Sequence, residues 1–452
     1  MTEQEQDKVA YLKTIKSVRE TNSCTKKLIE TNKLHNFIVD DSKLEGIVDF
    51  VIETVKLNYP TKESLKTIPI HGRYQHFETG DVPRLSKLIE DKWKGKLHFD
   101  DLEICRKLID LFIVSVLLDA GAGNEWGFTE PSFNTKIGRS EGIAVASFHM
   151  FCNGAFSSDN NDKFKVTGDK LSMLTKEDMI AGFQIKKGNE IAGFEGRFEL
   201  LKRLGSALIE FKDVFGVEGR PGNMIDYLIS KKATKTATGF DLELEDLWYL
   251  LMTSFKKVWP QEGRLKVYGE TIGDAWQLRN RIDESKIYYK TEELPEWSKV
   301  VTFHKLTQWL TYSLFLPLMK YGKFNILHKE FMTGLPEYRN GGLLVDFGYL
   351  TLKPEKFEQG IMLSKEVGFD PKIPTFKPDD DVIVEWRSCT ICLLDKLLPL
   401  VNDKMGIKGT EYEMILPQLI EAGSWASGRR IAKKLRSNGA PPIELFADGT
   451  VF

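Results

Sequence analysis

The sequence predicts a mainly α-helical fold, a single large helical domain with small β excursions. Apolar residues recur at helical spacing in several long segments, whereas strand-like patterns are confined to three short ones. Of the 452 residues, 42% are hydrophobic, which is enough for a continuous core. No Pro-, Ser- or Gly-rich linker interrupts the chain. We therefore predict an N-terminal helical segment, residues 1–60, packed on one main domain, residues 61–452.

The helices are predicted from the N-terminus onward. Apolar residues from Val9 to Val18 mark an amphipathic helix, and residues 42–55 form the next, with Ser42 as its N-cap and Glu45 completing a capping box. Residues 100–118 are apolar on nearly every face toward the C-terminal end, which predicts a helix through the middle of the domain. Further helices are expected over 195–215, 242–257, 301–321, 386–401 and 411–436. The strand-like segments are 164–166, 343–352 and 381–384.

Charge and cysteine content limit the classes of function. The 63 Lys and Arg nearly cancel the 65 Asp and Glu, and the net charge of -2 predicts no nucleic-acid partner and no membrane partner. The longest apolar stretch, 108–118, is far below the roughly 20 residues that span a bilayer. Five cysteines in so long a chain argue against a disulfide framework, and the polar, acidic N-terminus is unlike a signal peptide. We expect a cytoplasmic protein, with the nucleus left open.

One pair of segments carries residues suited to a sugar-plus-base site. GETIGDAWQLRN places Asp274 near Trp276, and FHKLTQWL then begins a helix. Two residue pairs on that helix are four apart and share a face: His304 with Gln308, and Lys305 with Trp309. Asp274, an aromatic plane and polar helix residues together fit such a site. The alternative is that Trp276 and Trp309 are core aromatics and Asp274 caps a turn.

The segment GLPEYRNGGLLVD places Tyr338 and Arg339 on a predicted turn before an apolar run. An arginine held on a rigid turn is suited to binding a carboxylate or phosphate through two hydrogen bonds. An arginine that joins loops by bonding to carbonyl groups is an equal alternative.

Two further motifs lie near the buried helix. LLDAGAGNEW lacks the third glycine of a dinucleotide fingerprint and follows a helix rather than a strand. It is interpreted as a loosened turn that directs Asp119 and Trp126 toward a cleft. RSEGIAVAS begins a helix, where Ser140 is a candidate cap and Glu141 either favours the helix dipole or acts chemically.

The evidence for a metal in the sequence is slight. His71 and His76 are separated by a spacing that matches no usual zinc motif, and whether a metal binds near them stays open. Cys389 and Cys392 form a CxxC on a predicted helix, but no second CxxC or His pair completes a site. Packed thiols are favoured there.

Several long motifs occur in order from His71 to Phe452: HGRYQHFETGD, LLDAGAGNEW, RSEGIAVAS, FEGRFELLKRLG, RPGN, FHKLTQWLTYSL, GLPEYRNGGLLVD, GSWASGRRIA and DGTVF. In these motifs the chain resembles an uncharacterised-domain family of the fungal uracil-catabolism gene set, which has bacterial relatives. The resemblance implies a role in breaking down uracil to urea and a three-carbon acid through ribosylated intermediates, including ribosylurea. The resemblance also leaves open that the protein associates with other uracil-catabolism enzymes.

A second resemblance is to the queuosine salvage proteins, which cleave the N-glycosidic bond of queuosine 5′-phosphate. Those proteins have a helical fold related to DNA glycosylases and carry an aspartate followed by a helix with the pattern F-x-K-x-x-Q. Asp274 followed by Phe303, Lys305 and Gln308 is similar, and Tyr338 with Arg339 resembles a later Tyr-Arg turn. The spacing is longer here because of a charged segment, 280–298. This resemblance implies a DNA-glycosylase-like helical core.

Together the resemblances imply an N-glycosidase that releases urea from ribosylurea or its 5′-phosphate. Asp274 is the candidate that stabilises an oxocarbenium-like state, orients water or attacks C1′. The remaining candidates, all for binding or protonating the substrate, are His304, Glu141, Trp276, Lys305, Gln308, Trp309, Tyr338, Arg339, Arg387, Asp119, Trp126 and His76. The mechanism requires no metal or cofactor, and the expected partner is a small riboside or ribosyl phosphate.

Two other classes of function stay open. A metal-dependent amidohydrolase that opens a pyrimidine-derived ring or a ureide would use His71 and His76. A non-catalytic scaffold for the other pathway enzymes would show no turnover by itself.

Overall fold

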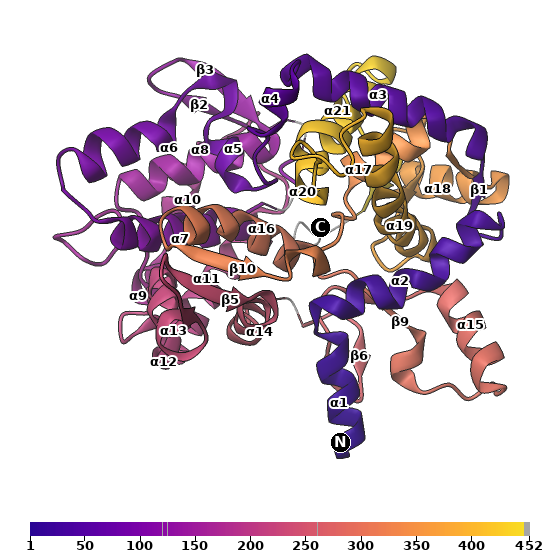
Figure 1. Cartoon of the computed structure of the whole chain (residues 1–452), viewed down its shortest axis with the longest axis horizontal. Coiled ribbons are helices and arrows are strands. Elements are labelled where there is room, and N and C mark those ends of the chain that lie inside the picture. Colours follow the sequence, from indigo (N-terminus) through magenta and orange to yellow (C-terminus); the bar gives the residue numbers. More distant parts are fainter. Residues whose placement is uncertain (120, 124, 260, 447–452) are drawn as a thin grey trace. The chain divides into compact units, whose positions relative to one another are not determined.

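The computed structural model describes residues 1–119, 121–123, 125–259 and 261–446, and the DGTVF motif lies outside them (Figure 1). The described chain is mainly helical with a few short strands, which confirms the predicted fold class. Contacts group it into two compact units: residues 1–71, 262–305 and 330–446, and residues 72–261 and 306–329. The boundary predicted at residue 60 stays a prediction, as does the DNA-glycosylase-like core.

The first unit consists mostly of helices. These are α1 (Glu3–Leu12), α2 (Ile15–Glu30), α3 (Leu44–Asn58), α4 (Lys62–Leu65), α15 (Arg279–Tyr289), α17 (Tyr338–Asp346), α18 (Pro354–Val367), α19 (Asp381–Lys404), α20 (Leu416–Leu419) and α21 (Trp425–Leu435). A π-helical turn, Ile420–Ser424, joins the last two. Short strands pair as β1 (Phe37–Val39) with β11 (Leu350–Leu352), β6 (Lys266–Val267) with β7 (Glu270–Thr271), β8 (Ala275–Gln277) with β9 (Val300–Thr302), and β12 (Thr375–Phe376) with β13 (Glu444–Leu445).

A hydrophobic core of this unit is built around α19. It combines apolar side chains of α3, α17, α19 and the 416–431 region with those of β1 and β11. Helix α19 also lies against α2, where Thr25 and Ser388 are joined by a hydrogen bond of 2.6 Å between their hydroxyls. Because α19 is surrounded in this way, most of its side chains from Val382 to Leu397 are buried.

The second unit contains a similar proportion of helices. They are α5 (Arg73–Phe77), α6 (Arg84–Lys87), a π-helical turn (Leu88–Lys94), α7 (Asp101–Leu117), α8 (Arg139–Cys152), α9 (Gly168–Met173), α10 (Lys176–Gly182), α11 (Phe194–Glu210), α12 (Lys212–Phe215), α13 (Met224–Lys231), α14 (Leu244–Ser254) and α16 (Lys305–Lys320), whose first residue belongs to the first unit. A hairpin joins β2 (Gly127–Glu130) and β3 (Thr135–Gly138), and a three-stranded sheet has the order β10 (Phe324–Leu327), β5 (Phe240–Glu243), β4 (Thr234–Lys235).

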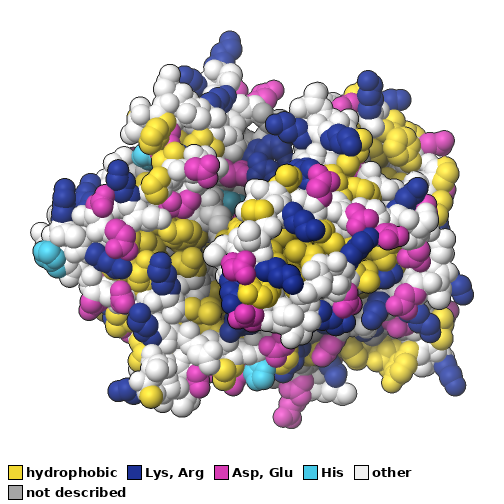
Figure 2. Space-filling view, turned by 45° about the horizontal axis from the view of Figure 1, so that its top comes forward, with side chains coloured by type: hydrophobic (Ala, Val, Ile, Leu, Met, Phe, Trp, Pro, Cys, Tyr) yellow, Lys and Arg dark blue, Asp and Glu magenta, His cyan; other side chains and the backbone are white. Residues whose placement is uncertain are grey.

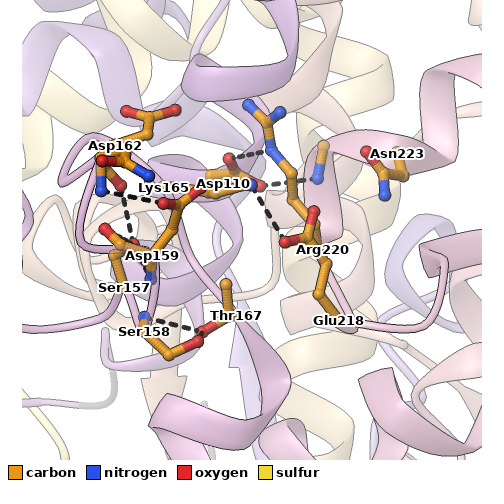
Figure 3. Close-up of polar contacts among 12 residues, drawn as sticks. Asp110, Ser157, Ser158, Asp159, Asp162, Lys165, Thr167, Glu218, Arg220 and Asn223 are labelled. Atoms are coloured by element: carbon orange, nitrogen blue, oxygen red, sulfur yellow. Dashed lines mark hydrogen bonds and ion pairs between the residues drawn. The ribbon is translucent and has the colours of Figure 1, made fainter.

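Helix α7 is the buried helix that the sequence predicts. Asp100 caps it by accepting a hydrogen bond from the backbone N–H of Glu103, and nearly all side chains from Ile104 to Leu117 are inaccessible to solvent. Its one buried acid, Asp110, bonds the Nε of Arg220 at 2.8 Å and the backbone N–H of Gly222 at 2.7 Å (Figure 3). This ion pair ties the 220–223 segment to the buried helix.

Replacing Asp110 with Ala is expected to destabilise the protein by about 3–5 kcal/mol, because the buried Arg220 loses one of its two carboxylate partners and keeps only Glu103, while the Gly222 N–H loses its acceptor. Asp226→Ala is the control, since Asp226 pairs with Arg106 at the surface with 49% of its side chain exposed, and such a pair contributes about 0–1 kcal/mol. Unfolding in guanidinium chloride measures both. An equal loss of unfolding free energy in the two variants would contradict the prediction that the buried ion pair contributes more to stability than the exposed one.

Three strand predictions were wrong in whole or in part. Residues 164–166 are irregular, because the buried Lys107 side chain binds the Phe164 carbonyl. Residues 381–384 form the first turn of α19, where Asp380 accepts a hydrogen bond from the Val382 N–H. Only Leu350–Leu352 of 343–352 is a strand. Tertiary packing decides whether such a short apolar run becomes a helix or a strand, because its sequence pattern is compatible with both.

The ends of several predicted helices were also wrong. Asp40 rather than Ser42 caps the 3-10 turn before α3, by accepting from the Ser42 N–H. The predicted helices 242–257 and 301–321 each begin with a short strand, and 411–436 begins with irregular residues.

Within the described ranges, no helix is both long and apolar enough to cross a membrane. Figure 2 shows Lys and Arg side chains interspersed with Asp and Glu over the visible face, in line with the near-zero net charge. All five cysteines are free thiols.

Candidate functional site

The pairing of β8 with β9 places Asp274 at the start of α16. Ala275, Trp276 and Gln277 pair with Thr302, Val301 and Val300, and the Asp274 carbonyl accepts hydrogen bonds from the N–H groups of Phe303 and His304 at 2.9 and 3.1 Å. The charged segment between the strands forms α15 and a 3-10 turn. The length of this charged segment therefore does not separate Asp274 from the FHK segment, residues 303–305.

The Asp274 carboxylate is surrounded by donors. Oδ1 accepts from Trp276 Nε1 at 2.9 Å and from Arg387 Nη1 at 2.8 Å, and Oδ2 accepts from the Lys305 N–H at 2.9 Å and from Arg387 Nη2 at 2.8 Å. Arg387 reaches it from α19 and stacks on the Phe303 ring at 4.1 Å. We call Asp274, Trp276, Phe303, Lys305 and Arg387 the Asp274 cluster.

The Asp274 cluster keeps its carboxylate ionised. Burial alone would raise the pKa of Asp274, but the charge and hydrogen bonds of Arg387, with those of the Lys305 backbone and Trp276, lower it to about 2. Even so, 18% of the Asp274 side chain is exposed. Asp274 is therefore held as an anion, in a two-bond ion pair with Arg387.

His304 stands beside this cluster as a neutral ring. Its Nε2 donates to the Leu12 carbonyl at 2.8 Å, and burial lowers its pKa. Its backbone φ of 45° is unusual for a residue other than glycine and turns the chain into α16. A buried neutral imidazole is a weaker proton donor than an imidazolium.

Glu337 is a candidate that the sequence reasoning missed. It caps α17 by accepting from the N–H groups of Arg339 at 2.7 Å and Asn340 at 2.6 Å. Burial raises the pKa of Glu337 to about 7, although the Asn340 N–H and the charges of Lys305 and His71 oppose the shift. Its position inside the GLPEYRNGGLLVD motif was a signal, but the sequence alone did not show that its pKa would be raised.

The neighbouring Tyr338 and Arg339 lie in the first turn of α17, not on a turn before it. Arg339 is buried, donates to the Gly439 carbonyl at 2.9 Å and lies over the Tyr338 ring at 4.8 Å. This is the loop-joining arrangement weighed as the alternative. Tyr338 is 37% exposed.

A second polar group, the Asp119 cluster, lies within the second unit and consists of Arg73, His76, Ser115, Asp119 and Ser140. Arg73 Nη1 donates to Asp119 Oδ2 at 2.9 Å and lies 3.0 Å from both His76 Nδ1 and Ser140 Oγ. Ser140 Oγ donates to Asp119 Oδ2 at 2.6 Å, so Ser140 bonds Asp119 instead of capping α8. These contacts bring together the segments around 73, 119 and 140.

Other predicted residues of the second unit lie around this cluster or in the core. Glu141, in the first turn of α8, acts electrostatically on Arg73. The His76 ring lies 5.5 Å from that of Trp309. Gln308 is fully buried. Trp126 is buried too and donates to the Phe183 carbonyl at 2.9 Å, as a core aromatic does.

Metal ligands do not gather among the described residues, where no three His, Cys, Asp or Glu side chains are arranged to hold an ion. His71 belongs to the first unit and His76 to the second. The Nδ1 of His71 lies 2.5 Å from Glu421 Oε2, and its ring is 5.8 Å from that of Trp425.

Comparisons with known proteins match nearly the whole chain. A family profile described as "Protein of unknown function (DUF1688)" covers residues 11–452. Uracil catabolism protein 4 of Lachancea kluyveri is 48% identical over 450 residues, 98% of this chain and 99% of that protein. Protein urg3 of Schizosaccharomyces pombe is 41% identical over 445 residues, again 98% of this chain and 99% of that protein. The first resemblance is thereby confirmed, and the resemblance to queuosine salvage proteins stays a prediction.

Proposed function

The chain belongs to the DUF1688 family, and from this premise we propose that it is an N-glycosidase of uracil catabolism that hydrolyses ribosylurea or its 5′-phosphate. The pathway is supported by the name of the Lachancea relative, which aligns over nearly its full length. The reaction class is supported by the opposite pKa shifts of two acids in the first unit, Asp274 and Glu337.

The observation that carries the proposal is the ionised and partly exposed side chain of Asp274. Departure of urea from C1′ leaves positive charge on the ribose ring, and a fixed negative charge stabilises that state. Four hydrogen bonds already fill the carboxylate oxygens. Asp274 therefore acts as a stationary charge rather than as a nucleophile or base.

Glu337 is the proposed proton donor. One carboxyl held ionised and another kept protonated near neutral pH is the division of roles expected of an acid and a stabilising charge. The C1′–N bond breaks with its electron pair going to nitrogen, which takes the Glu337 proton. Water then adds its oxygen to C1′, and the proton that it loses restores Glu337. His304, being neutral, is assigned to holding the turn before α16.

The direct test is to incubate the purified, folded protein with ribosylurea and with ribosylurea 5′-phosphate and to measure free urea and free sugar. Release of both products in equal amounts from either compound is expected. No release from either would overturn the N-glycosidase proposal. Stable co-purification with other pathway enzymes in that case would favour the scaffold instead.

The pH profile provides a separate prediction. Because Glu337 must be protonated to act and its pKa is about 7, kcat/KM is expected to be level below pH 7 and to fall about tenfold per pH unit above it. Asp274 stays ionised throughout this range. A profile that rises through pH 7 would contradict an acid role for Glu337.

A further inference from the structure

Helices α17 and α21 of the first unit lie side by side with their backbones in close contact (Figure 1). A Cβ atom on Gly428 of α21 would clash with the Arg339 carbonyl oxygen of α17, so no larger residue fits there. Ser424 lies four positions before Gly428, and residues four apart on a helix share a face. The face of α21 that meets α17 therefore includes Ser424.

This contact brings Ser424 to the end of α17 that carries Glu337. Ser424 Oγ donates to Asn340 Oδ1 at 2.8 Å, and both residues are inaccessible to solvent. Asn340 Nδ2 donates to the Leu335 carbonyl at 3.1 Å, and the Asn340 backbone N–H donates to Glu337 Oε1 at 2.6 Å. Asn340 thus joins three parts of the unit: α21, the segment before Glu337, and the Glu337 carboxyl itself.

Ser424 belongs to the π-helical turn Ile420–Ser424. Such turns are rare and are found frequently at functional sites. The same turn places Glu421 Oε2 2.5 Å from His71 Nδ1, and His71 acts electrostatically on Glu337. Two side chains of one π-helical turn therefore bind residues that act directly on Glu337.

We propose that Asn340 and Ser424 are positioning residues for the Glu337 carboxyl, so that the packing of α17 against α21 sets the pH above which the enzyme loses activity. The inference rests on the proposed function of Glu337 as proton donor. Burial raises the pKa of Glu337, and the Asn340 N–H opposes this shift because it favours the ionised carboxylate. A loosened Asn340 should weaken that bond, so the pKa should rise further and the acid should stay protonated to a higher pH.

Ser424→Ala removes the donor to Asn340 without changing any charge. The charged groups around Glu337 are Lys305, His71 with its partner Glu421, and Arg339, and all of them are retained. The midpoint of the alkaline fall in kcat/KM is therefore expected to move upward by about 0.5–1 pH unit.

Ser427→Ala is the matched control. Ser427 is as buried as Ser424 and donates to Thr54 Oγ1 of α3 at 2.9 Å, so its loss should lower stability to a similar extent. Because Ser427 bonds α3 rather than α17, this variant should keep the wild-type midpoint. Equal shifts of the midpoint in the two serine variants would overturn the inference.

A ¹³C NMR titration of the Glu337 carboxyl, assigned by comparison with Glu337→Gln, measures the same midpoint without substrate. An upward shift in Ser424→Ala but not in Ser427→Ala supports the positioning role even where no urea is released, a result that would overturn only the N-glycosidase. An unchanged midpoint in folded Ser424→Ala would overturn the positioning role. Should that variant fail to fold, Ser424→Cys, which is nearly isosteric and a weaker donor, should shift the midpoint upward by less. No shift in Ser424→Cys would equally overturn it.

Discussion

Asp274→Asn is expected to lower kcat for urea release by about 10²–10³-fold, because the charge that stabilises the oxocarbenium-like state is removed. The substitution also turns an amide N–H toward Arg387, which weakens a buried ion pair and lowers stability. Initial rates of urea release at saturating substrate measure the first effect, and thermal unfolding measures the second.

A matched substitution separates these two effects. Asp346 accepts two hydrogen bonds from Arg436, at 2.8 and 2.6 Å, in the same unit and with only 3% of its side chain exposed. Asp346→Asn should therefore lower the thermal midpoint comparably and leave kcat nearly unchanged. Full activity in a folded Asp274→Asn variant would remove Asp274 from the mechanism, while the urea assay of the wild type would still decide the reaction.

Glu337→Gln is expected to lower kcat by about 10²–10⁴-fold, since a glutamine cannot supply a proton to the departing urea. The amide oxygen can still accept a backbone N–H at the start of α17, so the fold should be retained. The residual activity should also lose the fall above pH 7 that the wild type shows. Rates measured across pH 5 to 9 test both points.

The control for this variant is Asp380→Asn. Asp380 is also an acid at a helix N-cap, where it accepts from the Val382 N–H at 2.8 Å, and burial likewise raises its pKa. Asn is a good N-cap, so wild-type activity and an unchanged alkaline limb are expected. If the fall in rate above pH 7 persists in Glu337→Gln, the group that titrates near pH 7 is not Glu337.

Asp274 and the FHK segment, residues 303–305, show what local sequence patterns could predict about the site. The sequence singled out both, and the β8–β9 pairing brings them together. Arg387 was named only among the candidates for binding or protonating the substrate, whereas in the structure it forms the ion pair that holds Asp274 ionised. The two residues are 113 positions apart, and no local pattern predicts which distant side chains will meet.

For Arg339 and Glu337, too, the sequence did not show which partners each side chain would have. Both lie in one recognisable motif, but the arginine is held by the Gly439 carbonyl, while Glu337, two positions before it, is the acid with the shifted pKa. Residues two positions apart at the start of a helix point toward different surroundings, so their partners separate their roles.

The sequence by itself determined the helical class, the buried helix α7 and the family. Helical periodicity, apolar content and long motifs are properties of consecutive residues, so they can be recognised without the fold. The pKa shifts of Asp274, His304 and Glu337 come from the tertiary structure alone. Those properties depend on desolvation and on partners from distant segments, and both exist only once the chain has folded.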